Sequence, residues 1–237
     1  MRFLLLALSL FVSSTVFADD LIEDFGTWNQ LNFNYVPKDS NIRGYLELQG
    51  RLKDDSQHVN QLIARPAIGY QVTPHLSLWG GYLYQATTYK GSTNHYWNEH
   101  RIFEQATFKD KYFGDVDFTS RTRFEQRNFD VADSGTSLRL RQMIRIDKPI
   151  YWGGTNVAFG GLYAAAYDEV FFNLNDEYNS ATKIKTGFDQ NRAWVGLGYK
   201  FNDNFKVETG YLNQYQEAVG GPNKMNHVLM TAVNVTF

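Results

Sequence analysis

The sequence predicts an all-β protein, an antiparallel transmembrane β-barrel of ten to twelve strands. The first supporting observation is an alternation of charged and apolar residues, clearest over residues 42–54. Successive side chains of a strand point to opposite faces, so this segment has one charged and one apolar face. The second is that no apolar run beyond the N-terminus is long enough for a spanning helix, and the mean hydropathy is −0.42. The third is the terminal residue, Phe237, with apolar residues two and four positions before it.

The N-terminus has the pattern of a secretory signal. Arg2 precedes an apolar run over residues 3–12, and Ala18 offers a cleavage point. We therefore expect a signal peptide over residues 1–18 and a single barrel domain over residues 19–237, exported to the bacterial outer membrane. The alternative is a secreted soluble all-β domain. The chain has no cysteine, which excludes a disulfide framework and thiol catalysis. The net charge of −2 gives no basic surplus for nucleic acid.

Eleven segments have strand character and cover most of the chain beyond the signal. In order they are 27–37, 42–54, 61–72, 75–87, 98–109, 115–129, 137–148, 156–172, 189–202, 204–216 and 226–237. Over the second half, short connections alternate with longer ones, as in outer-membrane barrels. Counting back from a periplasmic C-terminus places every short connection on the periplasmic side. Because single-chain bacterial barrels have even strand numbers, we expect either ten strands, with 27–37 as a partial edge, or twelve, with one unrecognised. Twelve is favoured over ten.

The parity of each strand assigns its residues to a face. Apolar residues occupy the outward parity, for example Leu62, Leu78, Leu140, Val195 and Leu229. An Arg or Lys facing lipid near the midplane would cost about 2–4 kcal/mol, so the charged parity must face inward. The residues predicted to line the lumen are Arg43, Glu47, Arg51, Arg65, Arg121, Arg123, Glu125, Arg127, Arg139, Arg141, Arg145, Arg192 and Glu208.

Two details qualify this pattern. In segment 98–109, Glu99 and Arg101 share one parity while His100 and Glu104 share the other, which a bulge or a position at the rim would explain. Large aromatic residues such as Trp79 also fall on the inward parity. They suggest a partly filled lumen and argue against a wide general porin.

Several short strings, taken in their order along the chain, resemble a known family. They are Glu99-His100-Arg101, Glu104-Gln105, Arg121–Arg127, Arg139-Leu140-Arg141, Asp168-Glu169, Phe171-Phe172-Asn173, Asn191-Arg192, Gly210-Tyr211-Leu212 and His227. In this order they resemble the bacterial domain-of-unknown-function family 2490, over essentially the whole chain beyond the signal. The resemblance implies an outer-membrane barrel of Gram-negative bacteria. It implies no activity and no catalytic residue.

The inward charges allow more than one functional hypothesis. Neighbouring Arg and Glu side chains can simply neutralise each other inside a narrow lumen. Alternatively, an excess of cations, about two to one in the parity assignment, can attract anions. The leading hypothesis is passage or binding of small anionic solutes through a narrow, net-positive lumen. The alternative is a non-conducting structural or lipid-handling barrel of the envelope.

A rim-localised hydrolase is the third hypothesis. Ser92, His95, Asn98 and His100 cluster around one connection but form no recognised catalytic motif. The sequence therefore identifies no catalytic, metal-binding or cofactor-binding residue. The expected partners are outer-membrane lipid and lipopolysaccharide, together with the barrel-assembly machinery, which would recognise Phe237. We expect a monomer that does not bind nucleic acid.

Overall fold

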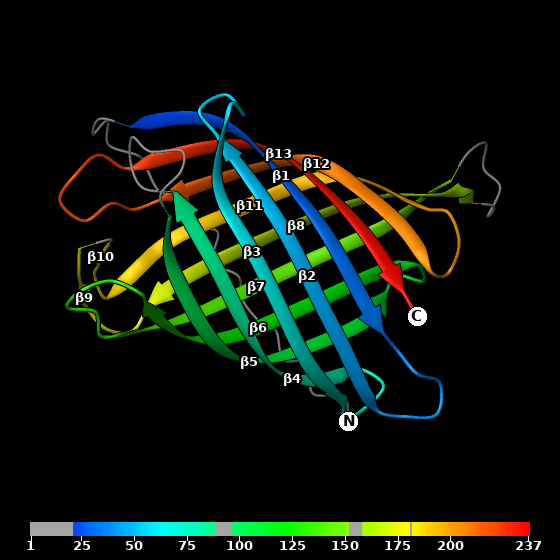
Figure 1. Ribbon diagram of the computed structural model, residues 1–237. Coiled ribbons are helices and arrows are strands. Elements are labelled where there is room, and N and C mark those ends of the chain that lie inside the picture. The colour runs from blue at the N-terminus through cyan, green and yellow to red at the C-terminus, as the bar shows by residue number, and fades with distance from the viewer. Residues whose placement is uncertain (1–20, 89–95, 152–157, 181) are drawn as a thin grey trace.

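The computed structural model describes residues 21–88, 96–151, 158–180 and 182–237. The signal segment, residues 1–18, lies outside the described residues. Eleven strands close into one barrel in the order β1-β13-β12-β11-β8-β7-β6-β5-β4-β3-β2 (Figure 1). The strands are β1 (Ile22–Tyr35), β2 (Ile42–Lys53), β3 (His58–Gln71), β4 (Leu76–Thr88), β5 (Tyr96–Tyr112), β6 (Val116–Phe129), β7 (Thr136–Tyr151), β8 (Ala158–Asn173), β11 (Gly187–Lys200), β12 (Phe205–Gln216) and β13 (Lys224–Thr236). Two short strands, β9 (Glu177–Tyr178) and β10 (Lys183–Ile184), pair with each other outside the barrel.

The prediction of an all-β barrel is confirmed, and its closure explains the strand number. Neighbouring strands are antiparallel except for β1 and β13, which pair in parallel from Ile22 opposite Lys224 to Asn34 opposite Thr236. Figure 1 shows both strands side by side with their arrows pointing to the same end. A purely antiparallel barrel needs an even number of strands, but one parallel pair permits eleven. The even-number argument that led to ten or twelve strands does not apply, and β1 is a full strand, not a partial edge.

The barrel has two different ends. The connections 36–41, 72–75, 113–115 and 201–204 lie at one end, here called the turn end, together with Phe237. The connections 54–57, 130–135, 174–186 and 217–223 lie at the other, here called the loop end. The terminal residue is held in the barrel, because its N–H donates to the Asn34 carbonyl and its carbonyl accepts from the Val36 N–H, both at 2.9 Å. The described residues contain no helix long and apolar enough to cross a membrane.

The outer face of the barrel is apolar over most strands. Ile68 is 70% exposed and Val195 is 59% exposed, although both lie within a strand. β5 pairs with β4 and β6 without any register shift, so no bulge explains the mixed parity there. Instead, His100 and Glu104 lie on the outer face, where the His100 ring bonds to the Tyr82 hydroxyl.

Large side chains fill part of the interior because small residues lie opposite them. Trp28, Tyr163 and Trp194 belong to a buried apolar cluster formed by β1, β8, β11, β12 and β13. A Cβ atom added at Gly198 would lie 2.1 Å from the Tyr163 ring, so glycine is required at this position. The interior therefore contains an apolar cluster beside many charged residues, and members of both groups line the candidate site.

Candidate functional site

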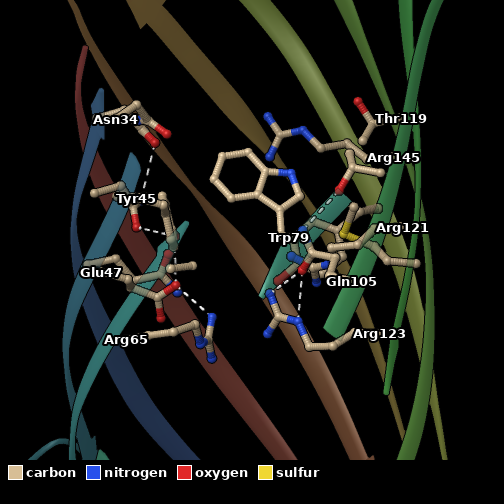
Figure 2. Close-up of a pocket in the computed structure, with 18 of the residues that line it drawn as sticks. Asn34, Tyr45, Glu47, Arg65, Trp79, Gln105, Thr119, Arg121, Arg123 and Arg145 are labelled. Atoms are coloured by element: carbon tan, nitrogen blue, oxygen red, sulfur yellow. Dashed lines mark hydrogen bonds and ion pairs between the residues drawn. The ribbon is translucent and has the colours of Figure 1, made fainter. Parts of the chain in front are cut away.

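A cavity of about 550 Å³ occupies the turn-end half of the barrel interior. It reaches the turn end at Val36, Pro74 and His75, which are all exposed. Its lining comes from β1 to β8 and from β11 to β13, so the whole circumference of the barrel contributes to it. The Trp79 indole projects into the cavity between two groups of charged residues (Figure 2) and donates to the Ser77 hydroxyl at 2.9 Å.

Positive charge dominates the cavity lining. Among the described residues that line it, ten are Lys or Arg and four are Asp or Glu. Most of the residues expected in the lumen are among them: Arg43, Glu47, Arg51, Arg65, Arg121, Arg123, Arg141, Arg145, Arg192 and Glu208. The other three, Glu125, Arg127 and Arg139, are buried nearer the loop end and do not line the cavity.

One wall of the cavity is an ion pair supported by a tyrosine. Arg65 on β3 donates to the Glu47 carboxylate on β2 at 2.7 Å. The Tyr45 hydroxyl lies 2.8 Å from the same carboxylate and 2.9 Å from the Asn32 amide oxygen. Each of these side chains belongs to the inward parity of its strand, so the alternation of the sequence alone brings them to one wall.

The opposite wall, across Trp79, is formed by β5 to β8. Arg123 donates from Nε to the Gln105 amide oxygen at 2.8 Å, and Arg121 donates to Glu169 at 2.8 Å. Figure 2 shows the Arg65 and Arg123 guanidiniums facing the cavity from opposite sides. Amide groups and shared carboxylates hold these guanidiniums, and the arginines of the cavity outnumber the carboxylates that could neutralise them.

At the turn end, the cavity is bordered by a second set of charges. Arg145 binds Asp147 at 2.6 Å and also contacts Glu208. Glu208 further accepts from the Tyr163 hydroxyl at 2.6 Å and from Lys206 at 3.2 Å. These pairs are less buried than those deeper in the barrel, so solvent reaches the cavity from this side.

Toward the loop end the interior is filled by buried ion pairs, here called the loop-end cluster: Glu99, Arg101, Glu125, Arg127 and Arg139. Glu99 binds Arg101 and Arg127, each at 2.6 Å. Glu125 binds Arg139 and also Arg141 of the cavity wall, each at 2.6 Å. Both carboxylates are 0% exposed. Among the described residues that line the cavity, the exposed ones are Val36, Pro74, His75 and Lys109, and all four lie at the turn end.

Several N–H groups around the cavity are buried without an acceptor. Among the described residues these include Nε of Arg65, Arg121 and Arg192, Nη1 of Arg123, and Nε2 of Gln49. A buried donor without a partner is costly, and such groups are rare in folded proteins. Here they accumulate in one cavity that already has an excess of positive charge. The arrangement can therefore bind a solute that brings both negative charge and hydrogen-bond acceptors.

Sequence reasoning did not assign Trp28 to a face, although it lies in the interior next to two arginines. The alternation of Gln30, Asn32 and Asn34 with apolar residues indicates the inward parity of β1, and Trp28 shares it. The strand parity therefore already indicated that Trp28 faces the interior. What parity could not indicate is which charges neutralise each other, because that depends on the strands brought together by closure.

The hydrolase cluster is not assembled in the described residues. Asn98 and His100 lie on the outer face of β5 and bond to Tyr84 and Tyr82, whereas Ser92 and His95 lie outside the described residues. The described residues contain no group of three or more side chains suited to hold a metal ion.

The fold and the interior define a closed β-barrel with a charged, partly filled core. The chain belongs to the family described as "Protein of unknown function (DUF2490)", whose sequence model matches residues 25–226. It is also similar to an uncharacterised protein of Methylorubrum extorquens, at 30% identity over 238 residues, covering 100% of this chain and 98% of that protein. No solved structure matches the chain.

Proposed function

We propose that this protein is an outer-membrane β-barrel that binds small anionic solutes in its interior cavity, with the turn end facing the periplasm. The observation that carries the proposal is the ratio of ten cationic to four anionic side chains around one cavity. A low-dielectric wall strengthens the field of such an excess and concentrates anions. The buried N–H groups without acceptors support the same conclusion.

Binding is favoured over passage because of the loop-end cluster. Conduction needs a continuous hydrated path, and the five charged side chains of the cluster occupy the interior on the loop side. Large aromatic side chains add to this closure, since Arg141 lies 4.4 Å from the Phe171 ring centroid and Phe171 is 0% exposed. In this proposal a solute enters and leaves at the turn end.

The location rests on two supports. Residues 2–18 have the pattern of a secretory signal, and the outer face of the barrel is apolar. Outer-membrane lipid, including lipopolysaccharide, would then cover the apolar belt. Fractionation of the native host, with an antibody against the protein, tests the location. Recovery in the soluble periplasmic fraction would contradict it.

Two measurements on refolded protein test the activity. In planar bilayers we expect no sustained current, while titration calorimetry should detect binding of small anions such as phosphate and no binding of the matched cations. A steady anion-selective current would instead establish passage. Folded protein that binds no anion at all would remove the proposal.

A lipid-handling barrel is the second candidate, and one feature of the outer face favours it. A groove of about 640 Å³ crosses the closing pair of strands, with a mostly apolar lining that includes Leu31, Leu48, Leu62, Tyr84 and Val233. This groove fits an acyl chain. Phospholipid that copurifies at one equivalent and is lost on Leu48→Asn substitution, in protein that binds no anion, would favour this candidate.

A further inference from the structure

Two arginines at the deep end of the cavity share a single aromatic ring. The Arg51 Cζ atom lies 3.9 Å from the ring centroid of Trp28, and the Arg192 Cζ atom lies 5.0 Å from it. Arg51 comes from β2 and Arg192 from β11, on either side of β1, β13 and β12. The closure of the barrel therefore brings two like charges together at one indole.

Neither guanidinium is neutralised by an ion pair with a carboxylate of the described residues. Most other interior arginines differ in this respect: Arg65 binds Glu47, for example, and Arg145 binds Asp147. Arg43, at the turn end of β2, donates to backbone carbonyls instead. Glu169 is the nearest carboxylate in the lining on the Arg192 side, but it already accepts from Arg121 and Arg141. Arginine does not lose its proton in proteins, so two interior guanidiniums that approach the same indole ring need a counter-charge.

The two arginines differ in how many hydrogen-bond acceptors they have. Arg51 donates to the amide oxygens of Gln49 and Gln61, at 3.0 Å and 2.8 Å. Arg192 makes only a long contact of 3.5 Å to Gln190, and its Nε is buried without an acceptor. The Gln49 side chain is 3% exposed, and its Nε2 also has no acceptor. Arg51, Arg192, Gln49 and Trp28 all line the same cavity.

We infer that Arg51, Arg192 and Gln49 form a binding site for a tetrahedral oxyanion, either free phosphate or a phosphate monoester. The inference rests on the proposed function, and it adds where in the cavity the anion binds and which class it belongs to. Two guanidiniums reaching in from separate strands, with an amide beside one of them, present donors from several directions. A tetrahedral oxyanion has oxygens to match, whereas a single carboxylate offers two in one plane. Trp28 provides an aromatic surface for both guanidiniums, and the Arg192 Cζ atom also lies 4.7 Å from the Phe171 ring centroid.

The test uses the full mature chain, refolded in detergent, and measures binding by calorimetry and by tryptophan fluorescence. The probes are inorganic phosphate, glycerol phosphate and acetate. We expect phosphate or its monoester to bind, acetate to bind at least tenfold more weakly, and Arg51→Gln and Arg192→Gln each to weaken phosphate binding by about tenfold to a hundredfold. The tighter of the two phosphate probes identifies the source of the phosphate group.

A matched control variant separates the loss of a binding contact from the general effect of removing one positive charge. Lys200→Gln removes one positive charge from a residue that lies over the Tyr163 ring but does not line the cavity, so phosphate binding should stay within about twofold. Trp28→Phe should abolish the phosphate-dependent change in fluorescence while calorimetric binding persists. Folding of every variant is checked by the different electrophoretic mobility of heated and unheated samples.

The outcomes separate this inference from the proposed function. If folded wild-type protein binds phosphate and the Arg51 and Arg192 variants bind it equally well, the site assignment is wrong while anion binding by the cavity stands. If acetate binds as tightly as phosphate, the assignment to tetrahedral oxyanions is wrong. If the folded wild-type protein binds none of the probes, both the site and the proposed function are refuted.

Discussion

Substitution of Glu125 by glutamine should destabilise the barrel more than the removal of an exposed charge. Glu125 is 0% exposed and lies at 2.6 Å from both Arg139 and Arg141, with Arg123 at 3.8 Å and Arg101 at 3.9 Å. The change keeps the size of the side chain and one acceptor oxygen but removes the charge that four guanidiniums share.

Removal of one partner from a buried ion pair costs about 3–5 kcal/mol, because the other charge stays buried without compensation. Here the loss lies at the lower end of that range, about 3 kcal/mol, because three of the four guanidiniums keep another carboxylate. Arg101 still binds Glu99, Arg139 still binds Asp189, and Arg141 still binds Glu169.

The assay is urea unfolding of the protein in phospholipid vesicles, followed by tryptophan fluorescence. The matched control is Asp117→Asn, which removes a carboxylate from an exposed pair with Lys111 at 2.7 Å. Exposed pairs contribute about 0–1 kcal/mol, so the control should unfold almost as the wild type does. A loss below about 1 kcal/mol for Glu125→Gln, or an equal loss for both variants, would refute the reasoning.

Three further substitutions or conditions have defined outcomes. Gly198→Ala should cost about 1–3 kcal/mol, since its Cβ would overlap a buried tyrosine ring; Gly80→Ala, with nothing within 4 Å, should unfold like the wild type in the same urea assay. Val195→Arg should cost about 2–4 kcal/mol in vesicles, and an unchanged unfolding midpoint would contradict a lipid-facing position. The backbone N–H and hydroxyl of Thr186 hold the pKa of Asp176 below its usual value, so this contact stabilises the loop above about pH 3.8 and is lost as the pH falls further. The protection factor of the Thr186 amide in hydrogen exchange, which corrects for the intrinsic effect of pH on the rate, should fall only in that acidic range; a fall at neutral pH would count against it.

Strand alternation made most of the fold predictable. All eleven expected segments correspond to barrel strands, and most ends agree within a few residues. The largest difference is β1, which begins at Ile22 because residues 22–26 pair with β13. In this segment the adjacent charged residues Glu23 and Asp24 interrupt the alternation of polar and apolar residues, so the sequence offered no local sign of this pairing. Parallel closure is a contact between the two ends of the chain, and no local pattern specifies it.

The site was predictable in composition but not in arrangement. Parity identifies Arg51 and Arg192 as inward residues, but their approach to Trp28 depends on the distance across the closed barrel. Likewise, Glu99 and Glu125 close the loop side only because neighbouring strands place several arginines around each of them. Alternation specifies a face, whereas the register between strands specifies the partner.

The central claim is that one face of this barrel contacts hydrocarbon while the other surrounds a hydrated, charged interior. The chain has no cysteine, so single cysteines at Ala67, which lines the cavity, and at Ile68, on the outer face, can each carry one nitroxide label. In phospholipid bilayers, electron paramagnetic resonance should show the Ile68 label colliding mainly with oxygen and the Ala67 label mainly with a water-soluble nickel chelate. Equal access of the chelate to both labels would contradict the account.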